Sequence, residues 1–263
     1  MTLNYARELQ AGISAVRAAA QICQRLQQKL TATDTLLKKD QSPVTVADFA
    51  AQAVICAHLQ QALPGDAVVG EENAAPLRSV KQQALRESVC QQVGSVMANT
   101  PDEDTVLQWI DRGNADASTA RYWTLDPVDG TKGFLRGGQY AIALALIENG
   151  EVVLGILGCP NLRVGTKQGA LFTAVKGDTA TVSSLFEAHS PATPIQVSQA
   201  KSARDALLCE SVEPGHSNLG ESVRVAELLG IVKAPYRIDS QCKYAAVARN
   251  DASIYLRLPA RES

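Results

Sequence analysis

One stretch decides how this chain is interpreted: Trp123-Thr-Leu-Asp126-Pro-Val-Asp129-Gly-Thr-Lys-Gly-Phe134. Its apolar start predicts a strand, and its two carboxylates lie in the turn that follows. Pro127 fixes one backbone angle and favours an extended Asp126, so we expect Asp126 to end the strand while Asp129 turns back toward the same point. Gly130 permits the turn, and a helix is expected to begin near Thr131.

The residue types in this stretch favour a site for a divalent cation. Mg²⁺ prefers oxygen ligands, and carboxylates also supply the charge that offsets its dehydration. Free N–H groups at the start of the following helix would hold an anion beside the metal. Asp-Pro-x-Asp-Gly is equally the composition of an ordinary turn, so the string alone leaves a metal–phosphate site and a simple turn open.

The bulk composition is that of a globular chain with a small-molecule partner. Its 263 residues are 46% hydrophobic and 20% charged, enough for one large domain or two of ordinary size. A net charge of −2 and an aromatic content of 5% argue against a nucleic-acid or membrane-surface partner. No G-x-x-x-x-G-K-[ST] loop of a nucleotide kinase is present.

Cysteine and histidine usage argues against a zinc site and for reduced core thiols. The six cysteines form no C-x-x-C pair, and there are only three histidines. The sequence has no signal-peptide pattern and no apolar run of membrane-spanning length, so a cytoplasmic location is expected. Oligomeric state is not readable from the sequence.

Apolar periodicity and turn residues predict helices first and strands later. Asp48 falls in the first turn of the second helix, where an acidic residue is also a simple dipole partner. The turn Glu148-Asn-Gly-Glu151 predicts a hairpin. The apolar strands around it imply a sheet covered on both faces. Helices are expected over 3–30, 45–63, 78–97, 100–109, 219–229 and 243–248, and strands over 67–69, 140–147, 152–157, 169–175, 206–210, 236–238 and 252–258.

Two further patterns predict where a helix begins and where a domain ends. Thr100-Pro-Asp-Glu103 resembles a capping box with proline at the first helical position. Residues 179–194 are Ser-, Thr- and Pro-bearing without a clear period, which predicts a domain boundary there.

Three motifs occur in order: Ser42-Pro-Val-Thr45 followed by Asp48, then Gly70-Glu-Glu72, then 123–134. Together they resemble the lithium-sensitive, Mg²⁺-dependent phosphatase superfamily that includes inositol monophosphatase and fructose-1,6-bisphosphatase. Longer strings look like the 3'(2'),5'-bisphosphate nucleotidases within it. These strings are Asp129-Gly-Thr-Lys-Gly-Phe-Leu-Arg-Gly137, Gly158-Cys-Pro-Asn-Leu162, Asp239-Ser-Gln-Cys-Lys-Tyr244 and Tyr255-Leu-Arg-Leu-Pro259.

The resemblance spans nearly the whole chain and implies a fold and an activity. The fold is the α/β (α+β layered) sugar-phosphatase fold of alternating helix and sheet layers. A metal-binding catalytic domain is expected over 1–185, and an incomplete nucleotide-contacting domain over 186–263. The activity is removal of the 3'-phosphate of adenosine 3',5'-bisphosphate, giving AMP and phosphate, with 3'-phosphoadenylyl sulfate as a further substrate. The cofactor is Mg²⁺, two or three ions per site, with Mn²⁺ as a substitute.

The resemblance also implies residue roles. Glu71, Asp126, the carbonyl of Val128 and Asp129 correspond to metal ligands. The pair that orients and deprotonates the attacking water corresponds to Asp48 and Thr131. Substrate contacts correspond to Gly130, Thr131, His216, Ser240, Lys243 and Arg257. A Lys and an Arg suit a bisphosphate, because Arg takes a phosphate bidentately and Lys adds a point charge.

The resemblance carries one further expectation. Related chains continue past the Tyr255–Pro259 string to a Trp-Asp-His-Ala-Ala-Gly motif whose Asp is another metal ligand, whereas this sequence stops at Ser263. Residues 1–263 alone are therefore expected to bind Mg²⁺ more weakly and to turn over slowly. Two other interpretations stay open: an inositol phosphate phosphatase of the same superfamily, and a non-catalytic nucleotide-binding or regulatory module.

Overall fold

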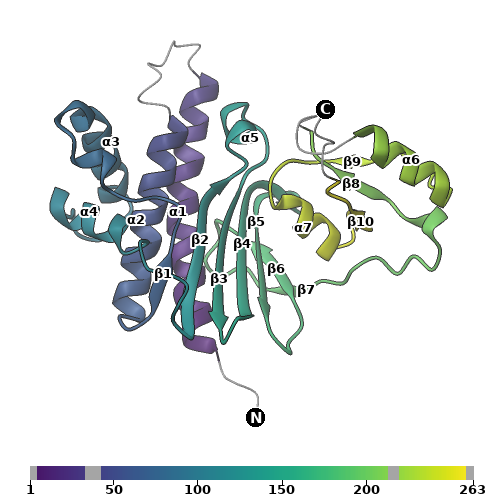
Figure 1. Ribbon diagram of the computed structural model, residues 1–263, viewed down its shortest axis with the longest axis horizontal. Coiled ribbons are helices and arrows are strands. Elements are labelled where there is room, and N and C mark those ends of the chain that lie inside the picture. The colour runs from purple at the N-terminus through teal and green to yellow at the C-terminus, as the bar shows by residue number, and fades with distance from the viewer. Residues whose placement is uncertain (1–4, 33–42, 213–218, 259–263) are drawn as a thin grey trace.

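Two long helices, α1 (Ala6–Ala32) and α2 (Pro43–Ala62), lie side by side and cover one face of a large sheet (Figure 1). The computed structural model describes residues 5–32, 43–212 and 219–258. The α1 helix is amphipathic and buries an alanine-rich stripe, whereas α2 is apolar on nearly every side. That difference follows from position, because α2 is packed against α1, the sheet and three further helices.

The large sheet has seven strands in the order β1-β2-β3-β4-β5-β6-β7. The β1–β2 pair is parallel and the following pairs are antiparallel. The hairpin between β3 and β4 is confirmed, with Asn149 and Gly150 both at positive φ. The strands are β1 (Ala67–Val69), β2 (Arg121–Asp129), β3 (Ala141–Glu148), β4 (Glu151–Val164), β5 (Lys167–Val175), β6 (Thr181–Ser184) and β7 (Thr193–Pro194).

The expectation that this sheet is covered on both faces is wrong for the second face. Side chains facing α1 and α2, such as Leu144 and Ile156, are buried, but their neighbours Ala143, Ala145 and Gly155 are only half-buried. The second face is apolar yet built from small residues, so leaving it partly open exposes little apolar area. Only α7 (Cys242–Ala248) lies over this face among the described helices, where it borders a groove of about 410 Å³.

The segment between β1 and β2 forms a side layer of short helices packed on α2. The expected helix over 78–97 is instead two 3₁₀ turns, Pro76–Arg78 and Val80–Gln82, followed by α3 (Gln83–Gly94). The expected capping box is also wrong. The helix α4 (Glu103–Asp111) starts three residues past Thr100, and its N-cap is Asp102, whose carboxylate accepts a hydrogen bond from the Thr105 N–H at 2.7 Å.

The C-terminal part builds a second, three-stranded sheet in the order β10-β8-β9. Its elements confirm the expected order; the three strands are shorter than expected, whereas the helix over 219–229 has the expected bounds and α7 begins one residue earlier than expected. The segment 179–194 is more regular than its composition indicates, because β6 and β7 extend the large sheet through it. The division into domains at residue 185 stays a prediction. The elements are a 3₁₀ turn (Ala203–Asp205), β8 (Leu208–Glu210), α6 (Leu219–Leu229), β9 (Tyr236–Arg237), α7 and β10 (Ile254–Tyr255).

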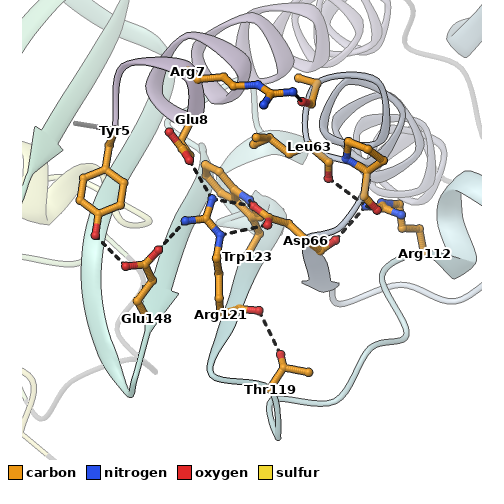
Figure 2. A network of polar contacts seen from close by, with 12 residues as sticks. Tyr5, Arg7, Glu8, Leu63, Asp66, Arg112, Thr119, Arg121, Trp123 and Glu148 are labelled. Carbon is orange, nitrogen blue, oxygen red and sulfur yellow. Dashed lines mark hydrogen bonds and ion pairs between the residues drawn. The ribbon is translucent and has the colours of Figure 1, made fainter. Parts of the chain in front are cut away.

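The start of β2 is fixed by a network of charged side chains (Figure 2). Arg121 donates to Glu8 at 2.9 Å and to both oxygens of Asp66 at 2.9 Å, and it also pairs with Glu148. Asp66 accepts a further hydrogen bond from the buried Trp123 indole. Acidic groups from α1, the α2–β1 turn and β3 are thus held by one guanidinium, which ties the helices to the sheet.

The expected state of the cysteines is confirmed, since all six are free and five of them are buried. No helix in the described ranges is long and apolar enough to cross a membrane.

Candidate active site

A bulge near the end of β2 brings Asp126 and Asp129 to the same face of the sheet. Asp126 pairs with Ala143 and Asp129 with Ala141, so three steps along β2 match two steps along β3. In a regular strand, side chains three residues apart point to opposite faces of the sheet. The extra residue of the bulge brings both carboxylates to the same face. Pro127, which lacks an N–H, lies within this interruption. The prediction that Asp126 ends the strand is therefore wrong, because β2 continues through Asp129.

The expected turn and helix after Asp129 are confirmed. Gly130 has φ of 92°, in the left-handed region that favours glycine, and α5 (Thr131–Leu135) begins directly after it. A Cβ on Gly130 would lie 2.6 Å from the Cβ of Ser240. The backbone at Gly130 is thus constrained both by its turn and by the close approach of Ser240. The helix α5 that follows packs against α1 and α2.

Glu71 and Glu72 follow β1 and are positioned by Gln52, a fully buried residue of α2. The Glu72 N–H donates to the Gln52 Oε1 at 2.9 Å, and the Gln52 amide donates to the carbonyls of Glu72 and Ile110. A Cβ on Gly70 would lie 2.5 Å from the same amide. Gln52 is not predictable as a site residue from the sequence, because a glutamine inside an apolar helix has no signature beyond its unusual polarity.

Burial and neighbouring carboxyls raise the pKa of three acidic side chains gathered here. Burial raises the pKa of Asp48 to about 8, with contributions from Glu72, Glu71 and Asp126. The pKa of Asp126 is raised to about 7 by burial, Asp129 and Glu71. The pKa of Glu72 is raised by burial and by Glu71. These groups come from α2, the loop after β1, and β2, so the fold brings together acidic side chains whose pKa values are raised by burial and by neighbouring carboxyls.

The donors fit a hard divalent cation in kind, although they do not converge on one point as they stand. The Asp126 Oδ1 atom is buried without a hydrogen-bond partner, which is costly unless something positive binds it. Val128, whose carbonyl is a predicted ligand, lies between the two aspartates on β2. Within the described ranges, no three His, Cys, Asp or Glu side chains already form a metal-holding group.

A second, basic half of the site lies across Asp129. The Asp129 carboxylate accepts a hydrogen bond from the Gln241 N–H at the start of α7, which joins the two sheets. A pocket of about 400 Å³ opens beside this contact. Its lining includes Asp129, Gly130, Thr131, Ser211, Ser240, Lys243, Tyr244, Tyr255 and Arg257.

Lys243 is the most deeply placed cation of this pocket. It is only 7% exposed, and burial lowers its pKa. Ser240 adopts a positive φ of 64°, which is uncommon for a residue with a side chain. Asp239 holds the segment before it, because its carboxylate pairs with Arg136 and accepts from the Val212 N–H at 3.0 Å. Asp239 begins one of the motif strings, but the sequence predicts no role for it.

The predicted site residues thus fall into two adjoining groups. One is acidic and holds Asp48, Glu71, Asp126, Val128 and Asp129; the other is the pocket with Gly130, Thr131, Ser240, Lys243 and Arg257. Asp129 belongs to both. The predicted Asp48–Thr131 pair comes from two packed helices, α2 and α5. His216 lies outside the described residues.

Comparisons with known proteins place this chain in a family of phosphatases. The inositol monophosphatase family matches residues 4–262, and the chain belongs to that family. Solved structures of similar fold include CysQ from Bacteroides thetaiotaomicron, with a TM-score of 0.60, 21% identity, and coverage of 94% of this chain and 78% of that one. The inositol monophosphatase of Anabaena has a TM-score of 0.60 at 19% identity, covering 96% and 75%.

Relatives with more similar sequences carry a more specific name. The 3'(2'),5'-bisphosphate nucleotidase 1 of Arabidopsis thaliana is 39% identical, with 98% of this chain and 79% of that protein aligned. The 3'(2'),5'-bisphosphate nucleotidase of Schizosaccharomyces pombe is 38% identical, over 98% and 78%.

Proposed function

We propose that this protein is a Mg²⁺-dependent 3'(2'),5'-bisphosphate nucleotidase that hydrolyses the 3'-phosphate of adenosine 3',5'-bisphosphate. One observation carries the proposal: Asp129 joins an acidic cluster suited to cations to a basic pocket suited to a second phosphate. The names of the Arabidopsis and fission yeast relatives support the substrate class.

In this proposal the acidic group holds the cations and the water. Glu71, Asp126, Asp129 and the carbonyl of Val128 would bind Mg²⁺, or Mn²⁺ in its place, and Gln52 would keep the Glu71 loop in position. When bound, the ions lower the pKa of a water and neutralise charge on the leaving oxygen.

Asp48 and Thr131 prepare the attack. The Asp48 carboxylate takes a proton from the water, and the Thr131 hydroxyl orients it toward phosphorus. Asp48 has to be ionised to do this, and the same positive charge that fills the cluster would lower its raised pKa. Positioning and charge stabilisation are most of what phosphoryl transfer requires, so no covalent nucleophile is needed.

The basic group holds the rest of the nucleotide. Lys243 and Arg257 border the pocket and would bind the 5'-phosphate, with Ser240 and Gly130 at its inner side and His216 as a further contact. An Arg adds bidentate geometry and a Lys adds a point charge. The sulfate of 3'-phosphoadenylyl sulfate extends from the same 5' position, so that compound is a second substrate in this proposal.

Phosphate release from adenosine 3',5'-bisphosphate, followed over a series of Mg²⁺ concentrations, tests the proposal. We expect release that requires Mg²⁺, is supported by Mn²⁺, falls on adding Li⁺, and exceeds release from inositol 1-phosphate. Faster release from inositol 1-phosphate would assign the protein to inositol phosphates instead. Calorimetric binding of the nucleotide without any hydrolysis would indicate a non-catalytic binding module.

A further inference from the structure

An aromatic pair forms the outer wall of the basic pocket. Tyr244 on α7 and Tyr255 on β10 both line it, and their ring centroids are 5.5 Å apart at an interplanar angle of 82°. This edge-to-face arrangement fixes the orientation of both rings. It uses the face of one ring and only the edge of the other, so the pair retains an aromatic face for a third ring.

The exposure of the two rings identifies which one is available. Tyr244 is 55% exposed although it directly follows the buried Lys243. Tyr255 is less accessible, because it is half-buried and the Lys243 ammonium lies 5.5 Å from its ring centroid. The ring of Tyr255 therefore already has a cation as its partner. Tyr244 instead lines both the basic pocket and the apolar groove on the open face of the sheet, so its ring lies where the two meet.

We propose that Tyr244 is the stacking platform for the base of the nucleotide, with Tyr255 holding it in place. The inference rests on the proposed function and deepens it by adding a residue that selects an aromatic substrate. The phosphate-binding groups Lys243 and Arg257 line the same pocket as the rings, so a phosphate and a flat base attached to one sugar reach both. The pocket volume of about 400 Å³ lies in the range that accommodates small organic ligands.

The chemistry of the platform predicts what it selects. Every base has a π-face, so stacking rewards a nucleotide over a sugar phosphate without distinguishing strongly among bases. An inositol phosphate offers no such face. Tyr244 therefore discriminates between nucleotides and sugar phosphates, while the acidic cluster acts on either.

Calorimetric titration of the whole chain with AMP and with ribose 5-phosphate, which lacks only the base, tests the platform. We expect wild type to prefer AMP by about tenfold, the effect of one stacked base. Tyr244→Ala should lose most of this preference by weakening AMP binding, while Tyr244→Phe, which keeps the ring, should restore it. Leu228→Ala, at a 79% exposed position on α6, is the matched surface control and should behave as wild type.

The outcomes separate the platform from the proposed function. Equal weakening of AMP and ribose 5-phosphate by Tyr244→Ala, or no base preference in wild type, would overturn the platform even if phosphate release from the nucleotide is observed. A base preference that depends on Tyr244, in a protein that releases no phosphate, would support the platform and contradict the nucleotidase proposal alone. Thermal unfolding of each variant checks that its fold is retained.

Discussion

The two ends of β2 carry acidic side chains from neighbouring elements, but the two groups are completed differently. At the start of the strand, Arg121 holds Glu8, Asp66 and Glu148, and its own pKa is raised, first by the hydrogen bond to Asp66 (Figure 2). At the far end, burial and the neighbouring carboxyls raise the pKa of Asp126 and of Asp48. A cluster neutralised within the chain supports the fold, whereas a cluster of mutually repelling carboxyls is suited to a charge brought from outside.

The largest expected effect comes from Asp126→Asn. The substitution removes one charged ligand and keeps the shape, so we expect phosphate release to fall on the order of 10³-fold, the loss of a major charge-stabilising group. The same change relieves repulsion around Asp126, so the metal-free variant should unfold at a slightly higher temperature than wild type. Unchanged turnover would contradict the role of Asp126.

Removing the cation at the start of β2 should instead lower the stability of the fold. Arg121→Met leaves three carboxylates without their cation, and we expect the free energy of unfolding to drop by about 2–3 kcal/mol, between the values for buried and surface pairs. Chemical denaturation measures this. Lys176→Met, which breaks an exposed pair with Glu151, is the control and should cost under ~1 kcal/mol. Similar losses for both variants would refute the contrast.

Gln52 links the fold to the acidic cluster. Gln52→Leu keeps the volume but leaves the Glu72 N–H and two carbonyls without their partner, so we expect a loss of about 1–2 kcal/mol in the free energy of unfolding. Mg²⁺ should bind about tenfold more weakly, as for other residues that orient metal ligands. Calorimetry measures this affinity. A normal Mg²⁺ affinity of the Gln52→Leu variant would show that the contacts of Gln52 are purely structural.

The pH dependence of metal binding follows from the raised pKa values. Asp126 and Asp48 have pKa values of about 7 and 8, above the ordinary 3.8, so the metal-free fold holds protons that the unfolded chain has lost. Their contribution to stability therefore declines as pH rises from about 4 to 8. Mg²⁺ competes with those protons, so it should bind more tightly at pH 8.5 than at pH 6. A Mg²⁺ concentration of ten times the Kd stabilises the folded protein by ~1.4 kcal/mol, and we expect this stabilisation at a lower Mg²⁺ concentration at pH 8.5. Thermal shifts of equal size at both pH values would contradict this.

Much of the fold was predictable from local signals. The stretch 123–134 predicted the turn and the helix after Asp129. The apolar periodicity predicted most of the other elements in order, because the pattern of apolar residues within an element indicates which of its sides is buried. The bulge at Pro127 and the uncovered face of the sheet were not predictable, since both depend on register and on what packs from elsewhere.

The site divides in the same way. Asp126 and Asp129 are local to one motif, so the residues between and after them predicted their proximity, although through a turn and not through the bulge that produces it. Gln52 acts through contacts with residues up to 58 positions away, and Tyr244 through its contact with Tyr255, neither of which leaves a pattern along the chain.

The central claim is that the acidic end of β2 binds a divalent cation. Titration of the protein with Mn²⁺, followed by electron paramagnetic resonance, tests it without depending on turnover. We predict that wild type binds Mn²⁺, that Mg²⁺ displaces it, and that Asp126→Asn loses most of this binding while Lys176→Met retains it. Equal Mn²⁺ binding by wild type and Asp126→Asn would contradict the claim.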